Sequence, residues 1–201
     1  PIGTSVDKRQ FFSFMDKMPD DVLVVCDEAY YEYADKERYP QTIKFVREGR
    51  NVLVFRTFSK LYGLAGFRVG YCVASENLNE ALWKVSPPFS VNKFAQIGAA
   101  SALDDKEHVK KTLEMNTRGK QFLYQNLKKM SVDFIPSETN FVTVDAKTDA
   151  QRICEEMQKE GVIIRHLGMY GRPNFFRVTV GTPGQNQKFI DVFKKIYKKR
   201  V

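Results

Sequence analysis

Residues 51–70 read NVLVFRTFSKLYGLAGFRVG, and this stretch decides the fold that the sequence predicts. Its first part, Val52–Phe55, is a short apolar run with the length and β-branched content of a buried strand. The run is followed by Thr57, Ser59 and Lys60. A lysine where a buried strand ends is a candidate reactive amine, because partial desolvation and a neighbouring cation would lower its pKa and free it to attack a carbonyl. The alternative is a strand that ends in a polar turn, with Lys60 on the surface.

The residues around Lys60 could also bind an anion. Thr57 and Ser59 place two hydroxyl groups before the lysine, and Arg68 follows it in a glycine-spaced segment. Hydroxyl and guanidinium groups together suit a phosphate. An amine that can bond an aldehyde, beside an anion site, is what pyridoxal 5′-phosphate requires of a protein. The stretch therefore predicts a site for this cofactor.

A second strand is predicted at Val22–Cys26, which is continuously apolar, as expected of a strand buried on both faces of a parallel sheet. Asp27 and Tyr30 follow it, and open α/β sheets bind ligands where their strands end. A third strand is predicted at Arg68–Ala74. Two strand–helix–strand passages before residue 75 favour a mostly parallel α/β layer. Asp27 could instead be a helix N-cap or a turn residue.

The remaining pattern predicts a large domain over residues 1–105, a connecting helix over 106–130 and a small α+β domain over 131–201. A helix of about 25 residues spans nearly 40 Å, enough to bridge two subdomains. Other helices are predicted at about Lys8–Lys17, Thr42–Glu48, Glu76–Val85, Asn92–Leu103, Asp149–Lys159 and from Pro183 to Lys199. Further strands are predicted at Asp133–Ile135, Asn140–Val144, Val162–Arg165 and Phe175–Val180.

Composition narrows the class of protein. The 201 residues carry a net charge of +8, with 43% hydrophobic and 28% charged residues, which is ordinary for a soluble globular protein. The absence of a long apolar run argues against a membrane span. The basic excess permits nucleic-acid binding, but much of it lies in Lys194–Arg200, where cations complement the end of a predicted helix. We therefore expect neither a nucleic-acid nor a membrane partner.

The cysteines and the first residue of the chain lead to two further predictions. Cys26, Cys72 and Cys154 have no metal-ligand spacing, so no metal site is expected, and they are interpreted as reduced core thiols in a cytoplasmic protein. The chain begins with Pro1 rather than Met. We therefore expect it to begin inside a longer product or to have been trimmed.

Several segments resemble one known family. DEAY at residues 27–30, followed by FRTFSKLYGLAGFRVGY at 55–71, closely resembles the fold-type-I aminotransferases that depend on pyridoxal phosphate, and within them the histidinol-phosphate aminotransferases. The supporting segments are PIGT, PPFSVNKFAQIGAASALDD, SETNFV and GVIIRHLGMYGRPNFFRVTVGT. The resemblance covers essentially the whole chain but only the C-terminal part of that family's chain. It implies part of the family's three-layer large domain, mostly parallel, followed by the small α+β domain.

The resemblance also assigns roles to residues. It implies that Lys60 is the lysine that bonds the cofactor and that Asp27 contacts the pyridine nitrogen. Tyr30 would contact the ring oxygen. The residues implied to hold the cofactor phosphate are Thr57, Ser59 and Arg68. The residues implied to bind substrate are Arg177 for the α-carboxylate, Arg165 for the phosphate and, more weakly, Asn140.

The activity implied is transfer of an amino group from histidinol phosphate to 2-oxoglutarate, giving imidazole-acetol phosphate and glutamate in histidine biosynthesis, by a homodimer. Related aromatic-amino-acid aminotransferases and threonine-phosphate decarboxylases share the same motifs and remain alternatives. A third alternative is a truncated, non-catalytic fragment with a basic binding surface. The family's N-terminal half, which supplies further walls of the cofactor site, is absent from these 201 residues.

Overall fold

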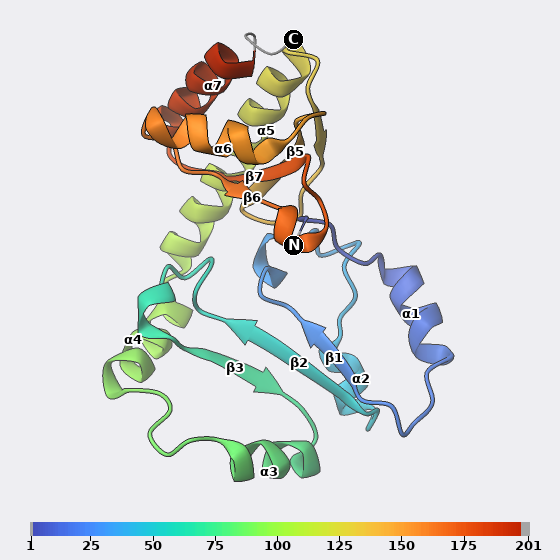
Figure 1. Cartoon of the computed structure of the whole chain (residues 1–201). Coiled ribbons are helices and arrows are strands. Elements are labelled where there is room, and N and C mark those ends of the chain that lie inside the picture. Colours follow the sequence, from blue (N-terminus) through green and yellow to red (C-terminus); the bar gives the residue numbers. More distant parts are fainter. Residues whose placement is uncertain (1, 198–201) are drawn as a thin grey trace. The chain divides into compact units, whose positions relative to one another are not determined.

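The computed structural model describes residues 2–197, which fall into two compact units (Figure 1). The first unit is Ser5–Lys110. The second combines the described residues before Ser5 with those after Lys110. Each unit has a sheet and a hydrophobic core of its own, so each is described by itself.

The first unit is built on a three-stranded sheet in the order β1-β2-β3 (Figure 1). Its strands are β1 (Val24–Asp27), β2 (Val52–Thr57) and β3 (Gly70–Val73). β1 pairs with β2 in parallel, whereas β2 pairs with β3 antiparallel. Within the described residues the predicted parallel arrangement is therefore confirmed for β1 and β2 and wrong for β2 and β3. The chain from Phe58 to Val69 holds only a short 3₁₀ turn, η2 (Ala65–Phe67), and a parallel return usually needs a full crossover helix.

One face of this sheet is covered by α1 (Lys8–Asp16) and α2 (Ile43–Arg47). The core between them and the sheet consists of Phe11, Met15, Cys26, Phe45, Val52 and Val54. On alternate positions Val25 is 53% exposed and Phe55 is 42% exposed. The prediction that Val22–Cys26 is buried on both faces is therefore wrong within the described residues, because Val25 is exposed on the face away from α1 and α2.

The C-terminal part of the first unit contains α3 (Glu76–Val85) and α4 (Lys93–Asp104). The small residues of α4 allow close packing, because Ala95 and Ala99 are buried against Phe58 and Val69. This second core holds the segment that follows β2. It therefore fixes the backbone on either side of Lys60.

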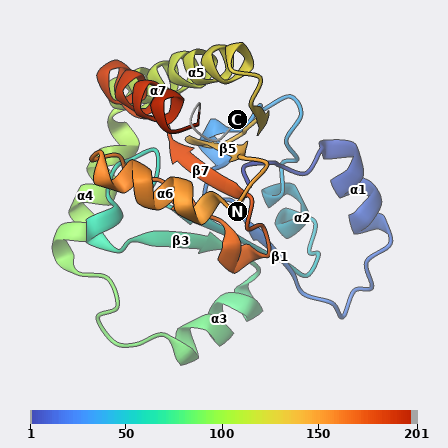
Figure 2. The same cartoon turned by 45° about the horizontal axis from the view of Figure 1, so that its top comes forward.

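The second unit is a four-stranded antiparallel sheet in the order β4-β5-β7-β6. Its strands are β4 (Asp133–Ile135), β5 (Phe141–Asp145), β6 (Arg165–His166) and β7 (Phe175–Thr179). Its helices are α5 (Lys106–Lys129), which begins in the first unit, α6 (Ala150–Lys159) and α7 (Pro183–Tyr197). In both views α5 and α7 run side by side (Figures 1 and 2). Phe176, Phe189 and Phe193 form the centre of the core.

The predicted helices are confirmed to within a few residues, and several begin at a side chain that caps the helix. Asp7, Asn92 and Asp149 each accept a backbone N–H of the following turn, at 2.9 Å. The predicted end of the last helix, Lys199, lies outside the described residues. The strand predicted at Val162–Arg165 is largely wrong, because β6 is only Arg165–His166 and Ile163 is 83% exposed. No helix between residues 2 and 197 has the length and apolar character needed to cross a membrane.

Candidate active site

Lys60 lies in the turn that follows β2, between two anchored residues. Phe58 and Leu61 are 5% and 1% exposed, and the Leu61 carbonyl lies 3.0 Å from Nε2 of His108. Within the turn, the N–H of Gly63 donates to the carbonyl of Lys60 at 3.1 Å. The Lys60 side chain is half-buried, and its Nζ lies 5.3 Å from the centroid of the Tyr30 ring. The amine therefore faces the turn that follows β1.

Asp27 is the last residue of β1, where it pairs with Phe55 of β2. Its Oδ1 accepts the N–H of Ala29 at 3.0 Å, so one carboxylate oxygen bonds within the turn that follows β1. A 3₁₀ turn, η1 (Tyr31–Tyr33), begins directly after Tyr30. The structure thus brings Asp27 and Tyr30 together in one short turn, and brings the ring of Tyr30 to the amine of Lys60.

Thr57 and Ser59 lie on the same segment as Lys60. Oγ1 of Thr57 accepts the N–H of Ser59 at 3.1 Å, which holds the first turn after β2. Thr57 pairs with Gly70 of β3. A Cβ on Gly70 would lie 2.7 Å from the carbonyl oxygen of Arg56, so this close approach of the strands requires glycine.

Arg68 ends the 3₁₀ turn that precedes β3, with a left-handed backbone at φ 55°. Its Nη1 donates to the carbonyl of Ala65 at 2.7 Å, and the side chain is exposed. The guanidinium is therefore bonded to its own turn in this structure. Arg68 lies in the same loop as Ser59 and Lys60, but no contact between its side chain and theirs is observed among the described residues.

The three predicted substrate residues belong to the second unit. Arg165 on β6 pairs with Arg177 on β7, and Thr143 on β5 pairs with Arg177 from the other side. The Arg177 guanidinium lies 4.6 Å from the ring centroid of Phe141. Asn140 precedes β5, and its carbonyl accepts the N–H of Val180 at 2.8 Å. The structure therefore brings Arg165 and Arg177 together, with Asn140 three residues from Thr143.

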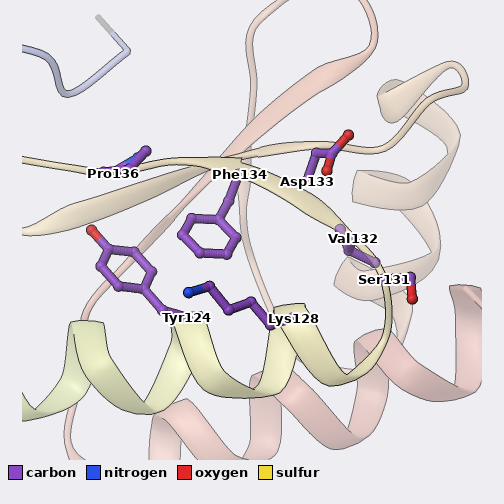
Figure 3. A pocket seen from close by; sticks show the side chains of 7 residues that line it. All are labelled: Tyr124, Lys128, Ser131, Val132, Asp133, Phe134 and Pro136. Carbon is purple, nitrogen blue, oxygen red and sulfur yellow. The ribbon is translucent and has the colours of Figure 1, made fainter.

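Each unit contains a cavity, and neither is lined by the predicted site residues. In the second unit a cavity of about 570 Å³ lies beside the end of α5 (Figure 3). Two of its polar groups already have partners: the Tyr124 hydroxyl accepts the N–H of Ser137 at 2.8 Å, and Asp133 pairs with Lys147 at 2.8 Å. In the first unit a cavity of about 640 Å³ is lined in part by Phe55, Arg56 and Gly70. No cluster of His, Cys, Asp and Glu suited to a metal ion occurs within residues 2–197.

The comparisons with known proteins agree with one another. The sequence model of the family described as Aminotransferase class I and II matches residues 1–193. The chain belongs to this family. A histidinol-phosphate aminotransferase from Akkermansia muciniphila is 45% identical over 196 residues, which are 98% of this chain and 53% of that relative. A second, from Caldicellulosiruptor saccharolyticus, is 41% identical, with 98% of this chain and 55% of the relative covered.

Solved structures show the same aminotransferase fold. The histidinol-phosphate aminotransferase from Sinorhizobium meliloti, solved in complex with pyridoxal 5′-phosphate, matches all of this chain with a TM-score of 0.92 and 26% identity. The match covers 55% of that structure. This member of the aminotransferase class I and II family thus spans about half the length of the curated relatives it matches.

Sequence reasoning missed one polar cluster of this aminotransferase chain. Glu28 is 2% exposed and is paired with Arg56, whose Nη2 lies 2.8 Å from its Oε2. These two residues lie next to Asp27 and Thr57 in the sequence. The sequence did contain a signal for this pair. A glutamate directly after a buried strand and an arginine within the next strand are both expected to need partners of opposite charge.

Proposed function

We propose that this chain carries the cofactor-binding part of a pyridoxal-phosphate-dependent aminotransferase, with Lys60 as the residue that bonds the cofactor. The observation that carries the proposal is the approach of Lys60 Nζ to the Tyr30 ring, 5.3 Å from its centroid, in the turn that begins at Asp27. Family membership supports it, as does the pyridoxal phosphate in the S. meliloti relative.

The chemistry of the side chains fits this cofactor. The first unit offers an amine, a carboxylate and a phenol on turns that follow neighbouring strands. Thr57 and Ser59 add two hydroxyl groups three and one residues before the lysine, and Arg68 adds a cation in the same loop. Hydroxyl and guanidinium groups are donors to phosphate. We propose that these three hold the cofactor phosphate and so fix the ring during the reaction.

When bound, pyridoxal phosphate supplies an aldehyde that bonds an amine and a ring that accepts electron density. The Asp27 carboxylate would keep the ring nitrogen protonated. The Tyr30 hydroxyl would donate to the ring oxygen. Once the substrate amine has displaced it, Lys60 Nζ would take the proton from the substrate Cα as a general base and return it as an acid.

For the substrates, we propose histidinol phosphate and 2-oxoglutarate. The amino group of the first is transferred to the second, which gives imidazole-acetol phosphate and glutamate, a step in histidine biosynthesis. The support is identity of 39–45% to curated relatives named histidinol-phosphate aminotransferase. Arg177 is proposed to bind the α-carboxylate and Arg165 the phosphate, with Asn140 as a further contact. A cytoplasmic homodimer is part of the same proposal.

The first experiment tests the cofactor. Pyridoxal phosphate added to the complete gene product should produce a new absorbance band, and borohydride should then trap the cofactor on Lys60. Lys60→Ala should abolish both. The matched control is Lys44→Ala, which removes an exposed lysine whose ion pair is with Glu48, one helical turn along the chain. A band that survives Lys60→Ala contradicts the assignment.

The second experiment separates the substrate classes. The protein is supplied with histidinol phosphate, an aromatic amino acid or threonine phosphate, each with 2-oxoglutarate, and glutamate and carbon dioxide are measured. Glutamate from histidinol phosphate supports the proposal. Carbon dioxide from threonine phosphate indicates a decarboxylase instead. A protein with no cofactor band but with salt-sensitive affinity for polyanions would be a binding module with a basic surface.

A further inference from the structure

We propose that the Glu28–Arg56 pair positions the candidate active site, by fixing the turn that carries Asp27 and Tyr30 to the strand that leads to Lys60. This inference rests on the proposed function. It assigns no contact with cofactor or substrate to either residue. Both act through the backbone of their neighbours in the sequence.

The Glu28 carboxylate is fully buried and fully bonded. Its Oε2 accepts from Nε of Arg56 at 2.9 Å and lies 2.8 Å from Nη2 of the same guanidinium. Its Oε1 accepts from Oγ1 of Thr42 at 2.5 Å. A buried carboxylate is tolerated only where its lone pairs are satisfied in this way, so the pair permits very few arrangements of the surrounding chain.

The backbone of Glu28 is tied to the same strand as its side chain. Its N–H donates to the carbonyl of Phe55 at 2.9 Å, directly after the last register pair of β1 and β2, Asp27 and Phe55. Its carbonyl accepts the N–H of Tyr31 at 3.0 Å. Glu28 therefore joins the end of β1 to the 3₁₀ turn and holds both to β2.

Arg56 extends this attachment to the loop after Tyr30. The carbon at the centre of its guanidinium lies 3.7 Å from the centroid of the Tyr31 ring. On that ring lies a second cation, Lys36, whose Nζ is 3.3 Å from the centroid. Although burial opposes it, hydrogen bonds to Tyr71 and Glu28 raise the pKa of the Arg56 guanidinium, so it stays charged. One arginine thus contacts Glu28 within the Asp27–Tyr30 turn and Tyr31 directly after it, and it lies directly before Thr57.

The Glu28–Arg56 pair is better suited to positioning its neighbours than to adding stability. A buried ion pair often adds little net stability compared with an apolar pair of the same volume, because desolvation offsets the attraction. What the pair adds is a defined geometry, and reactive groups must be held to within about 0.5 Å to be productive. The pair lies one residue from Asp27 and one residue from Thr57, where a small shift of either strand end would move the two parts of the site apart.

The test is a charge-neutral double variant, Glu28→Gln with Arg56→Met, made in the complete gene product. Removing both charges cancels the direct electrostatic effect, while the two-pronged bond that fixes the geometry is lost. Urea unfolding without cofactor shows whether the variant is folded. We expect the dissociation constant for pyridoxal phosphate to rise at least tenfold and the spectroscopic pKa of the bound cofactor to shift by more than half a unit. Borohydride should still trap the cofactor on Lys60.

The matched control is Glu48→Gln with Lys44→Met, which removes an exposed ion pair from α2. It should leave both the dissociation constant and the spectroscopic pKa unchanged.

A folded Glu28/Arg56 double variant with native affinity and native spectroscopic pKa would overturn the inference. If that variant does not fold, Arg56→Lys decides, because it keeps the charge but not the two-pronged donor: weakened cofactor binding supports the inference and native binding overturns it. If the native protein shows no band, or a band that survives Lys60→Ala, the proposed function itself fails.

Discussion

Arg165 and Arg177 lie directly opposite each other on the antiparallel strands β6 and β7. Opposed residues on such strands have Cβ atoms about 5 Å apart and point to the same face of the sheet. Two guanidinium groups at this spacing repel each other, and a shared anion relieves the repulsion. The Arg177 guanidinium is also held over the ring of Phe141, which limits its freedom to move away. We therefore propose that the pair binds a carboxylate or a phosphate.

Removal of either arginine should weaken the binding of anionic substrates. Arg177→Gln is expected to raise KM for both histidinol phosphate and 2-oxoglutarate by about 10- to 100-fold, because a hydrogen bond to a charged group contributes about 1.5–3 kcal/mol. Arg165→Gln should raise KM for the phosphate substrate more than KM for 2-oxoglutarate. Steady-state kinetics with each substrate varied in turn measures both effects. The control is Arg152→Gln, an exposed position on α6; equal effects at Arg152 and Arg177 would contradict the assignment.

The contact between β2 and β3 predicts a second result. Gly70→Ala would place a Cβ 2.7 Å from the backbone oxygen of Arg56, so the strands must move apart next to Thr57. We expect a loss of about 1–3 kcal/mol in the free energy of unfolding, together with weaker binding of pyridoxal phosphate. Gly66→Ala is the matched control, because a Cβ there meets no atom within 4 Å. Urea unfolding of both variants checks the prediction, and equal stability of the two would refute it.

Local features of this fold could be predicted from the sequence. The predicted helix starts near Lys8, Asn92 and Asp149 agree with the structure, in which Asp7, Asn92 and Asp149 each bond the backbone a few residues on, a local interaction that does not depend on the rest of the chain. The positions of Asp27 and Lys60, near the ends of β1 and β2, agree with the prediction from a similar local pattern, a polar residue soon after an apolar run. Such signals depend on a few neighbouring residues, so they survive in the final structure.

Features that depend on distant partners could not be predicted. The run Val162–Ile164 has strand composition, but a short apolar run cannot be told apart from other structure by its pattern alone, and Ile163 is exposed. The antiparallel direction of β3 depends on how the chain returns after Lys60. The pairing of Glu28 with Arg56 joins residues 28 positions apart, and nothing in the local pattern of either residue identifies its partner.

Two threonines near β5 offer a matched comparison. Among the described residues, Oγ1 of Thr143 is buried without a hydrogen-bond partner, whereas Oγ1 of Thr139 lies 2.8 Å from Oγ of Ser137. Thr143→Val removes an unsatisfied polar group at nearly constant volume, so we expect about 0.5–2 kcal/mol of added stability. Thr139→Val breaks a satisfied bond and should cost about 1–2 kcal/mol. Urea unfolding would show the two changes with opposite signs, and a loss of stability in both would refute the interpretation of Thr143.

The final prediction concerns alkaline pH. Burial, with a smaller contribution from the charge of Glu28, raises the pKa of the Cys26 thiol from 9.0 to about 11. Below pH 9 the thiol is neutral in the folded and the unfolded chain, so its contribution to stability is fully present. Between pH 9 and 11 the unfolded chain loses this proton while the folded chain keeps it, so the free energy of unfolding falls, by roughly 1–3 kcal/mol.

Urea unfolding of the native protein at pH 8, 9, 10 and 11 measures this loss. The same series with Cys26→Ala shows how much of the loss depends on the thiol, because the variant lacks it. The alanine variant should be less stable at pH 8, because it leaves a cavity in the core around Phe11, Met15 and Val54. Its stability should nevertheless fall less steeply than that of the native protein between pH 9 and 11. Ser101→Ala, an exposed change on α4, should keep the native slope. If Cys26→Ala also keeps the native slope, the pKa of the thiol is the same in the folded and the unfolded chain. Burial of Cys26 then does not cause the loss of stability at alkaline pH.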